Sequence, residues 1–136
     1  MIFSQTSKYA IRALVHLAHY ESTPRLSPEI AEELDIPKCF LAKILQDLVR
    51  RNLLQSFKGR GGGFKLARAP DRITLLEIVQ AVEGPEFGQH CLLGLSECGD
   101  HNPCPLHDQW TLHGNQFLNM LQSQTLGQLT VPNDRV

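Results

Sequence analysis

The chain has 136 residues, 42% of them hydrophobic and 20% charged, with a formal net charge of −1. This length allows one compact domain with its own core, and the even composition excludes collagen-like, low-complexity and disordered chains. Charged residues interrupt every apolar stretch, so we expect no signal peptide and no membrane-spanning segment. We therefore expect a cytoplasmic protein with reduced thiols, which favours metal or redox chemistry over disulfide bonds.

The charges are distributed unevenly along the chain. Residues 37–68 hold eight basic residues and one acidic residue, Asp47, a net charge of +7. The remaining chain carries five basic and thirteen acidic residues, a net charge of −8. Such a basic segment is typical of a nucleic-acid site, although a solvated lysine-rich surface has the same charge. The residue pattern within the segment distinguishes these alternatives.

Two helices are predicted before the basic segment. Apolar residues recur at helical spacing over residues 6–20, and a polar turn follows. Ser27 is the predicted N-cap of a second, short helix, with Pro28 at its first position. A turn over residues 35–37 separates this helix from the next one.

The third predicted helix, over residues 38–51, has an apolar face that includes Phe40 and an opposite basic face. A short helix, a tight turn and a helix with an exposed basic face form a helix-turn-helix, whose second helix enters the major groove of DNA. Its candidate DNA-contacting residues are Lys38, Cys39, Lys43, Arg50 and Arg51.

Two short strands, near residues 54–58 and 64–66, are predicted to flank four glycines. We interpret this hairpin as the wing of a winged helix. Lys58 and Arg60 lie at its tip, and Arg60 suits the narrow, negative minor groove. The glycines could instead form only a flexible turn. A nucleotide-phosphate cradle is excluded because the Walker spacing is absent and no helix follows.

A fourth helix is predicted over residues 73–82, capped by Thr74 and closed by Gly84. After a long loop, a fifth helix is predicted over residues 105–123, and the tail from Val131 is predicted to fray. One side of the fifth helix carries a stripe that we expect to face the same helix of a second subunit. This stripe consists of Leu106, Trp110, His113, Phe117 and Leu121.

The loop before the fifth helix concentrates soft metal ligands. Six residues separate Cys91 from Cys98, five separate Cys98 from Cys104, and two separate Cys104 from His107. Structural zinc sites use tighter cysteine pairs, so these gaps favour an iron–sulfur cluster with His107 as the fourth ligand. Zinc, a thiol redox switch and semi-buried cysteines without a ligand remain as alternatives.

Other residues compete for the fourth ligand position. His90 and His101 lie near the cysteines in sequence, and Asp100 or Asp108 could supply an oxygen ligand. A side chain of a partner subunit is a further alternative. Cys39 is far from the loop in sequence and is a poor candidate ligand.

Several of these segments together resemble the IscR/NsrR family of bacterial transcription regulators. They are SKYAIRAL, KGRGGGFKLAR, the three-cysteine loop with PCPLH, and the closing TLGQL. The resemblance implies a homodimer with an N-terminal winged helix, a long dimerisation helix and an iron–sulfur cluster that governs operator binding. It implies Cys91, Cys98 and Cys104 as cluster ligands, with His107 where the IscR branch has the histidine of its two-iron cluster. The nitric-oxide-sensing branch uses an acidic residue where this chain has Lys8, which disfavours that coordination.

Two departures from the IscR pattern limit what carries over. The first cysteine gap is one residue longer, and the third helix has Cys39 and Ala42-Lys43 in place of a serine and an acid–amide pair. We therefore expect a different preference for DNA sequence.

The predicted fold is mainly α with a small β-hairpin wing. We expect a winged helix-turn-helix DNA-binding domain (residues 1–84), a cluster-binding loop (85–104), and a dimerisation helix with a C-terminal tail (105–136). We predict a transcriptional regulator that acts as a repressor and is controlled by an iron–sulfur cluster. The preferred cluster type is 2Fe-2S, and 4Fe-4S is the alternative. Its partners are an operator DNA duplex and a second copy of the chain, without a membrane or a small-molecule substrate. We expect no enzyme, because no acid–base pair is evident; the alternative is a zinc-bound or cofactor-free thiol switch.

Overall fold

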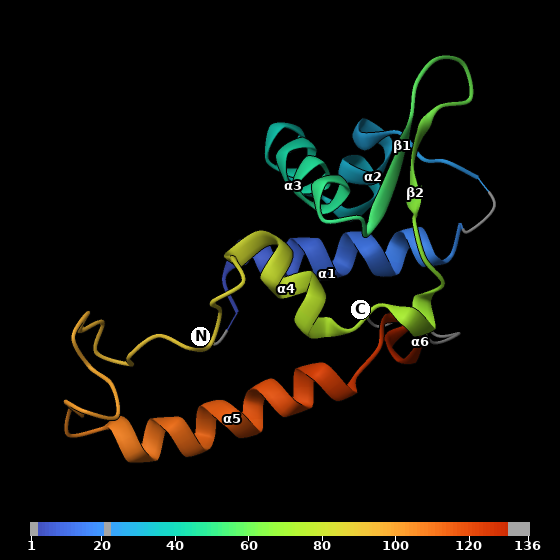
Figure 1. The fold of residues 1–136 in the computed structure, drawn as a ribbon. Helices are drawn as coiled ribbons and strands as arrows, with labels where there is room; N and C mark the ends of the chain where they lie inside the picture. The colour runs from blue at the N-terminus through green and yellow to red at the C-terminus, as the bar shows by residue number, and fades with distance from the viewer. Residues whose placement is uncertain (1–2, 21–22, 131–136) are drawn as a thin grey trace.

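The computed structural model describes residues 3–20 and 23–130 of the chain. It confirms a mainly helical winged helix with a two-stranded antiparallel hairpin (Figure 1). The tail from Val131 lies outside the described residues. The elements in chain order are α1 (Gln5–Ala18), α2 (Ser27–Leu34), α3 (Lys38–Arg50), β1 (Leu54–Phe57), β2 (Gly63–Leu66), the 3₁₀ helix η1 (Pro70–Arg72), α4 (Leu75–Glu83), α5 (His107–Ser123) and α6 (Leu126–Leu129).

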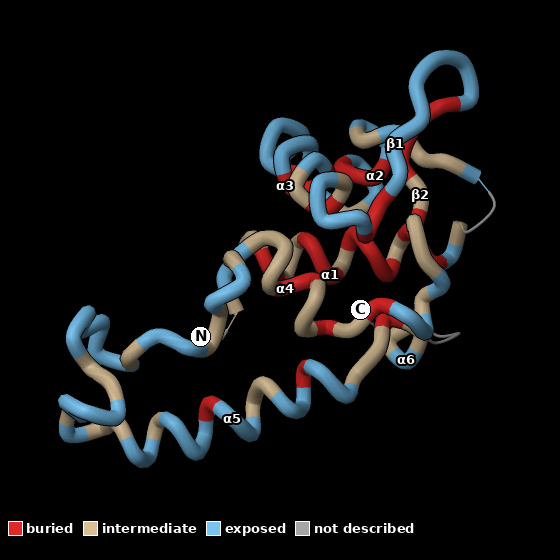
Figure 2. Tube along the Cα trace, in the orientation of Figure 1, coloured by how far each residue is buried: buried red, intermediate tan, exposed pale blue. Residues whose placement is uncertain are grey.

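Helix α1 forms the centre of the hydrophobic core. Its Ala10, Leu14 and Leu17 are fully buried, because α2, α3, α4 and β2 all pack around this helix (Figure 2). Burial of each such leucine contributes about 1.5–3 kcal/mol relative to exposure. Within the described part of the chain, no helix is long and apolar enough to cross a membrane.

The helix-turn-helix forms as predicted, with two local corrections. Helix α2 begins at Ser27 itself, so the N-cap is Leu26, whose N–H donates to the Glu29 carboxylate at 3.2 Å. Phe40 leaves the predicted apolar face of α3. It is 41% exposed, and its ring meets that of Tyr9 edge-on at 5.4 Å, whereas the next residue, Leu41, is fully buried.

The wing is attached to the body through Arg25. The backbones of Arg25 and Phe64 exchange two hydrogen bonds, of 2.9 and 2.7 Å, which add a short bridge to the outer edge of β2. Gly63 permits this approach, since a Cβ there would lie 2.5 Å from the Arg25 carbonyl carbon. Leu54 opposite Leu66 packs the base of the hairpin into the core, and the tip projects from the body (Figure 1).

The end of α5 is joined to the start of α4. The Leu75 N–H donates to the Gln124 carbonyl at 2.9 Å, and the Leu126 N–H donates to the Ile73 carbonyl at 2.8 Å. Leu121 and Leu126 are fully buried in the same core as the winged helix. The C-terminal part of α5 is therefore fixed to the DNA-binding part of the chain.

The apolar stripe predicted to face a partner packs largely on its own chain. Leu121 is buried, Phe117 lies against the rings of Phe3 and Phe87, and the Trp110 indole N–H donates to the His90 carbonyl at 2.9 Å. The loop before α5 folds back over this side of the helix, which the helical period alone does not reveal. The outward apolar residues of α5 are instead Leu112 and Met120, 58% and 48% exposed.

Candidate functional site

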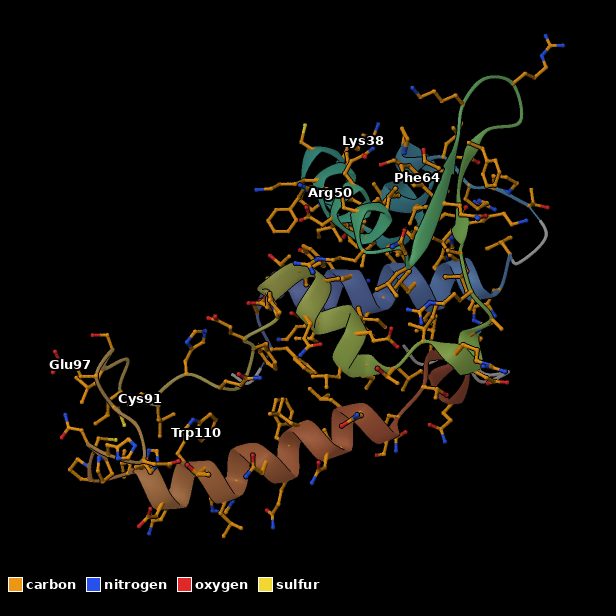
Figure 3. The ribbon with its side chains drawn as sticks, in the orientation of Figure 1. Lys38, Arg50, Phe64, Cys91, Glu97 and Trp110 are labelled. Carbon is orange, nitrogen blue, oxygen red and sulfur yellow. The ribbon has the colours of Figure 1, made fainter. Side chains whose placement is uncertain are left out.

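The predicted DNA-contacting residues lie on one end of the molecule. On α3, residues Lys38, Cys39, Lys43 and Arg50 are exposed, and Figure 3 shows Lys38 and Arg50 at the surface of this helix. Arg51, which caps the C-terminus of α3, is exposed as well. The wing tip projects from the same end of the molecule (Figure 1). This arrangement matches a helix for the major groove flanked by a hairpin.

Lys58 and Arg60 complete this surface at the tip of the wing. Both are exposed, and neither forms an ion pair with any residue that the structure describes. Arg50, in contrast, pairs with Asp47 three residues earlier on α3. The wing tip therefore offers its cations to a phosphate with no competing carboxylate.

Arg68 belongs to the basic segment in sequence but not to this surface. Its guanidinium donates to the Glu77 carboxylate at 2.5 Å and to the Arg72 carbonyl at 3.1 Å. Partial burial acts to raise the pKa of Glu77, but the hydrogen bonds from Arg68 and Thr74 outweigh it, so this pKa lies below its usual value. Arg68 thus joins the wing to the start of α4.

The three loop cysteines converge although they are well separated in sequence. The sulfurs of Cys91, Cys98 and Cys104 all lie within 4.8 Å of one another. Cys91 Sγ and Cys104 Sγ are 3.7 Å apart, so the thiols are free, and the Cys104 N–H donates to Cys98 Sγ at 3.4 Å. All three side chains are half-buried.

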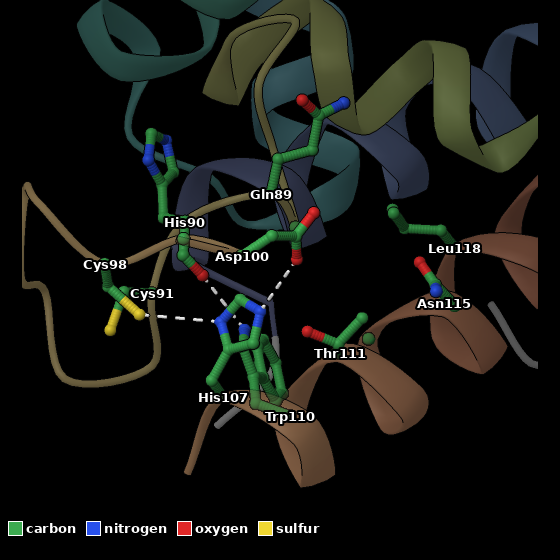
Figure 4. A pocket seen from close by; sticks show the side chains of 13 residues that line it. Gln89, His90, Cys91, Cys98, Asp100, His107, Trp110, Thr111, Asn115 and Leu118 are labelled. Carbon is green, nitrogen blue, oxygen red and sulfur yellow. Dashed lines mark hydrogen bonds and ion pairs between the residues drawn. The ribbon is translucent and has the colours of Figure 1, made fainter. Parts of the chain in front are cut away.

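His107, the first residue of α5, lies beside these sulfurs. Its Nδ1 is 3.5 Å from Cys98 Sγ, and its Nε2 is 3.2 Å from Asp100 Oδ1 (Figure 4). The same residues line a pocket of about 290 Å³ between the loop and α5. Cys39 lies apart from them on α3, as predicted.

Two contacts to α5 hold the cysteine loop, residues 85–104, in place. The Trp110 indole bonds to the His90 carbonyl directly before Cys91. Gly88 has φ +82°, and a Cβ there would lie 2.8 Å from the side chain of Leu118. The beginning of the loop therefore approaches α5 closely at Leu118, and Trp110 holds the segment before Cys91 one turn from His107. Sequence reasoning placed Trp110 on an outer stripe and missed this role.

The environment of the thiols differs from one to the next. Hydrogen bonds from the backbone of Leu95 and Leu93 and from the neighbouring thiols outweigh partial burial and lower the pKa of Cys91 to about 7. The Cys104 backbone N–H acts to lower the pKa of Cys98, but partial burial and the neighbouring sulfurs outweigh it and raise this pKa. Near neutral pH, Cys91 therefore has substantial thiolate character, the form that binds metals.

The donor set fits a soft metal. In a tetrahedral site with metal–sulfur bonds of 2.3 Å and metal–nitrogen bonds of 2.0–2.1 Å, two sulfurs lie about 3.8 Å apart, and a sulfur and a nitrogen about 3.6 Å. The observed 3.7 Å and 3.5 Å match these separations. Wide gaps in sequence thus do not produce wide gaps in space. These two pairs suit one ion, and three sulfurs within 4.8 Å of one another also suit the ligands of a cluster.

Comparison with known proteins identifies the family. A profile of the Rrf2 family, described as iron-dependent transcriptional regulators, matches residues 3–132. The chain belongs to the Rrf2 family. A protein of Aquifex aeolicus that is named as an HTH-type transcriptional regulator is 36% identical to this Rrf2 protein over 131 residues. The match covers 95% of this chain and 91% of the relative. The relatives are transcriptional regulators and not enzymes, as the sequence predicts.

Solved structures show the same fold. CymR, the global cysteine regulator of Bacillus subtilis, superposes on this Rrf2 protein with a TM-score of 0.78 and 23% identity, covering 96% of each chain. IscR of T. potens superposes with a TM-score of 0.75 and 23% identity, covering 93% of this chain and 84% of IscR. Together with the family match, these structures confirm the resemblance predicted from sequence.

Proposed function

We propose that this Rrf2 protein is a cytoplasmic repressor whose affinity for operator DNA depends on an iron–sulfur cluster held by the cysteine loop. The observation that carries the proposal is the convergence of three thiols and His107 next to α5, in a chain with a separate basic winged helix. The family's description as iron-dependent regulators and the sequence resemblance to the IscR branch favour iron.

On the DNA side, α3 presents Lys38, Cys39 and Lys43 to base edges and nearby phosphates. Arg50 and Arg51 at the other end of α3 are placed for the phosphate backbone. Lys58 and Arg60 act from the wing, with Arg60 the minor-groove residue. The cations among these residues form a surface that Arg68 does not share, because Arg68 is paired with Glu77.

On the metal side, Cys91, Cys98, Cys104 and His107 are the proposed ligands. A bound cluster would supply a centre that gains or loses an electron or is destroyed by oxidants, with 2Fe-2S as the first choice and 4Fe-4S as the second. The residues themselves close the loop: Cys91 at its start is brought to Cys104 and His107 at the beginning of α5. Loss of ligation releases this closure.

A homodimer connects the two sites in this proposal. The exposed Leu112 and Met120 of α5 are the apolar residues available for a second copy. Two recognition helices must then reach successive major grooves, about 34 Å apart. The C-terminal end of α5 is fixed to α4, and the cysteine loop contacts its N-terminal end. Opening of this loop would therefore change how α5 is held, and with it the distance between the two α3 helices of the dimer.

A specific observation also favours a second candidate, a regulator with a single zinc ion in the same site. Two separations among the proposed ligands, Cys91 Sγ to Cys104 Sγ at 3.7 Å and Cys98 Sγ to His107 Nδ1 at 3.5 Å, are those expected around one tetrahedral ion. The DNA-binding surface and the dimer are the same in this alternative. Only the identity of the centre, and hence the signal, differs.

Anaerobic purification followed by metal and acid-labile sulfide analysis separates the two candidates. The iron–sulfur proposal expects a coloured protein with equal amounts of iron and sulfide, and a visible spectrum that changes in His107→Ala but not in His101→Ala. Colourless protein with one zinc per chain supports the second candidate. Colourless protein without bound metal contradicts both.

A further inference from the structure

His107 has different neighbours at its two ring nitrogens. Nδ1 lies 3.5 Å from Cys98 Sγ, whereas Nε2 lies 3.2 Å from Asp100 Oδ1 (Figure 4). A neutral imidazole carries its single proton on one nitrogen only. Asp100 as a carboxylate accepts but does not donate, so this contact requires the proton on Nε2. Nδ1, on the side of the sulfurs, is then unprotonated and able to bind a metal.

We propose that Asp100 is a positioning residue that selects the Nδ1-binding form of His107 for the metal centre. The inference rests on the metal site of the proposed function, but it holds for a cluster and for a single ion alike. In metal sites generally, a carboxylate that accepts the second ring N–H fixes the tautomer and the orientation of the histidine.

The backbone around Asp100 explains why its carboxylate is available at this point. Gly99 and Asn102 exchange backbone hydrogen bonds of 3.4 and 3.2 Å, which close a tight turn with Asp100 inside it. Cys98 directly precedes this turn, and the Cys104 N–H donates back to Cys98 Sγ. One short segment therefore positions two of the thiols and the carboxylate that orients the histidine.

The geometry argues against Asp100 as a metal ligand. Its oxygen approaches Nε2, across the imidazole ring from the nitrogen that faces Cys98. The Asp100 side chain is also 95% exposed, so its contact with His107 contributes little to folding. Substitution of Asp100 therefore tests the orientation of the ligand and leaves the fold intact.

Asp108 provides a matched control. It is exposed, adjacent to His107 in sequence, and has no hydrogen bond to the His107 ring in the structure. Asp108→Ala removes the same charge at nearly the same place. Asp100→Asn is the conservative variant, because its amide oxygen still accepts a hydrogen bond from Nε2.

The test uses the full-length, cluster-free, reduced protein with ¹⁵N-labelled histidine and one equivalent of Cd²⁺ as the probe. Two-bond ¹H–¹⁵N spectra, assigned with His107→Ala, identify which ring nitrogen binds the metal. The wild type and Asp108→Ala should bind through Nδ1 with Nε2 protonated. Asp100→Ala should bind Cd²⁺ about 10- to 100-fold more weakly and show a mixture of both ring forms, with Asp100→Asn in between.

Either of two results overturns the inference: binding through Nε2 or no histidine binding in the wild type, or an Asp100→Ala protein with wild-type affinity and spectrum. Iron and sulfide analysis of wild-type protein purified anaerobically, before its cluster is removed, is a separate readout. Absence of iron with the expected Cd²⁺ spectra refutes the iron–sulfur proposal alone. A normal cluster with no effect of Asp100→Ala refutes the positioning role alone.

Discussion

Arg60 and Arg68 lie in the same basic segment, but their surroundings in the structure differ. Arg60 is exposed at the wing tip, whereas Arg68 is paired with Glu77. We predict that Arg60→Ala weakens DNA binding and reduces its dependence on salt, and that Arg68→Ala leaves this dependence unchanged. Both substitutions remove one positive charge, so the difference between them isolates the position of the charge.

The size of the effect follows from counterion release. Each protomer exposes six cations on α3, at its C-cap and on the wing, namely Lys38, Lys43, Arg50, Arg51, Lys58 and Arg60. If a dimer places about six such charges on phosphates, the slope of log affinity against log salt is about −5.4, and affinity falls about 2,000-fold between 50 and 200 mM salt. Arg60→Ala removes two contacts per dimer, so the slope becomes about −3.6 and the fall about 150-fold.

The assay is fluorescence anisotropy of a labelled duplex that the protein selects from a random pool, measured at four salt concentrations. Thermal unfolding of each variant controls for stability, because loss of the half-exposed Arg68–Glu77 pair costs at most about 1 kcal/mol. Equal slopes for Arg60→Ala and Arg68→Ala, or a wild-type slope near zero, would refute the assignment of the wing tip to DNA.

Three further predictions concern stability, thiol chemistry and the dimer. Because the folded-state pKa of Glu77 is depressed, its carboxylate stabilises the fold above the unfolded-state pKa, and this stabilisation is lost as pH falls through the folded-state pKa. Glu77→Gln should therefore flatten the acid side of the plot of Tm against pH. An unchanged plot would contradict this. Cluster-free protein treated with glutathione disulfide should form a Cys91–Cys104 disulfide and release two glutathione thiols per bond, and peptide mapping that finds another pairing first would reject the geometry. Leu121→Ala should destabilise the fold by about 2–5 kcal/mol, whereas Leu112→Ala should spare Tm and weaken the dimer in sedimentation equilibrium; an unaffected dimer would exclude this face of α5.

Local sequence patterns predicted most of the helices and the hairpin. The helical spacing of apolar residues predicted α1 and α3, and α4 has Thr74 as its N-cap and Gly84 as its C-cap, as predicted. Spacing and capping both depend on residues only a few positions apart. The winged-helix class followed from the order of these elements. The Ser27 cap was displaced by one residue, which is the usual uncertainty of a helix boundary.

Contacts between distant segments were harder to predict. The side of α5 with Phe117 and Leu121 is apolar whether it meets a partner or its own chain. The packing of its own core on Leu121, and of Phe3 and the cysteine loop on Phe117, decides between them. The number of residues between two thiols likewise says little about their distance once a turn such as that at Gly99 closes the loop. The role of Asp100 depends on which ring nitrogen it meets, and no sequence pattern carries that information.

In the proposed function, the occupied metal centre alters how tightly the winged helix binds DNA. The most direct measurement titrates one selected operator duplex with anaerobic cluster-loaded protein and with the same preparation after chelation, at a single salt concentration. We expect dissociation constants that differ at least about tenfold, corresponding to a coupling of about 1.4 kcal/mol or more. Equal affinities of two well-folded forms would contradict it.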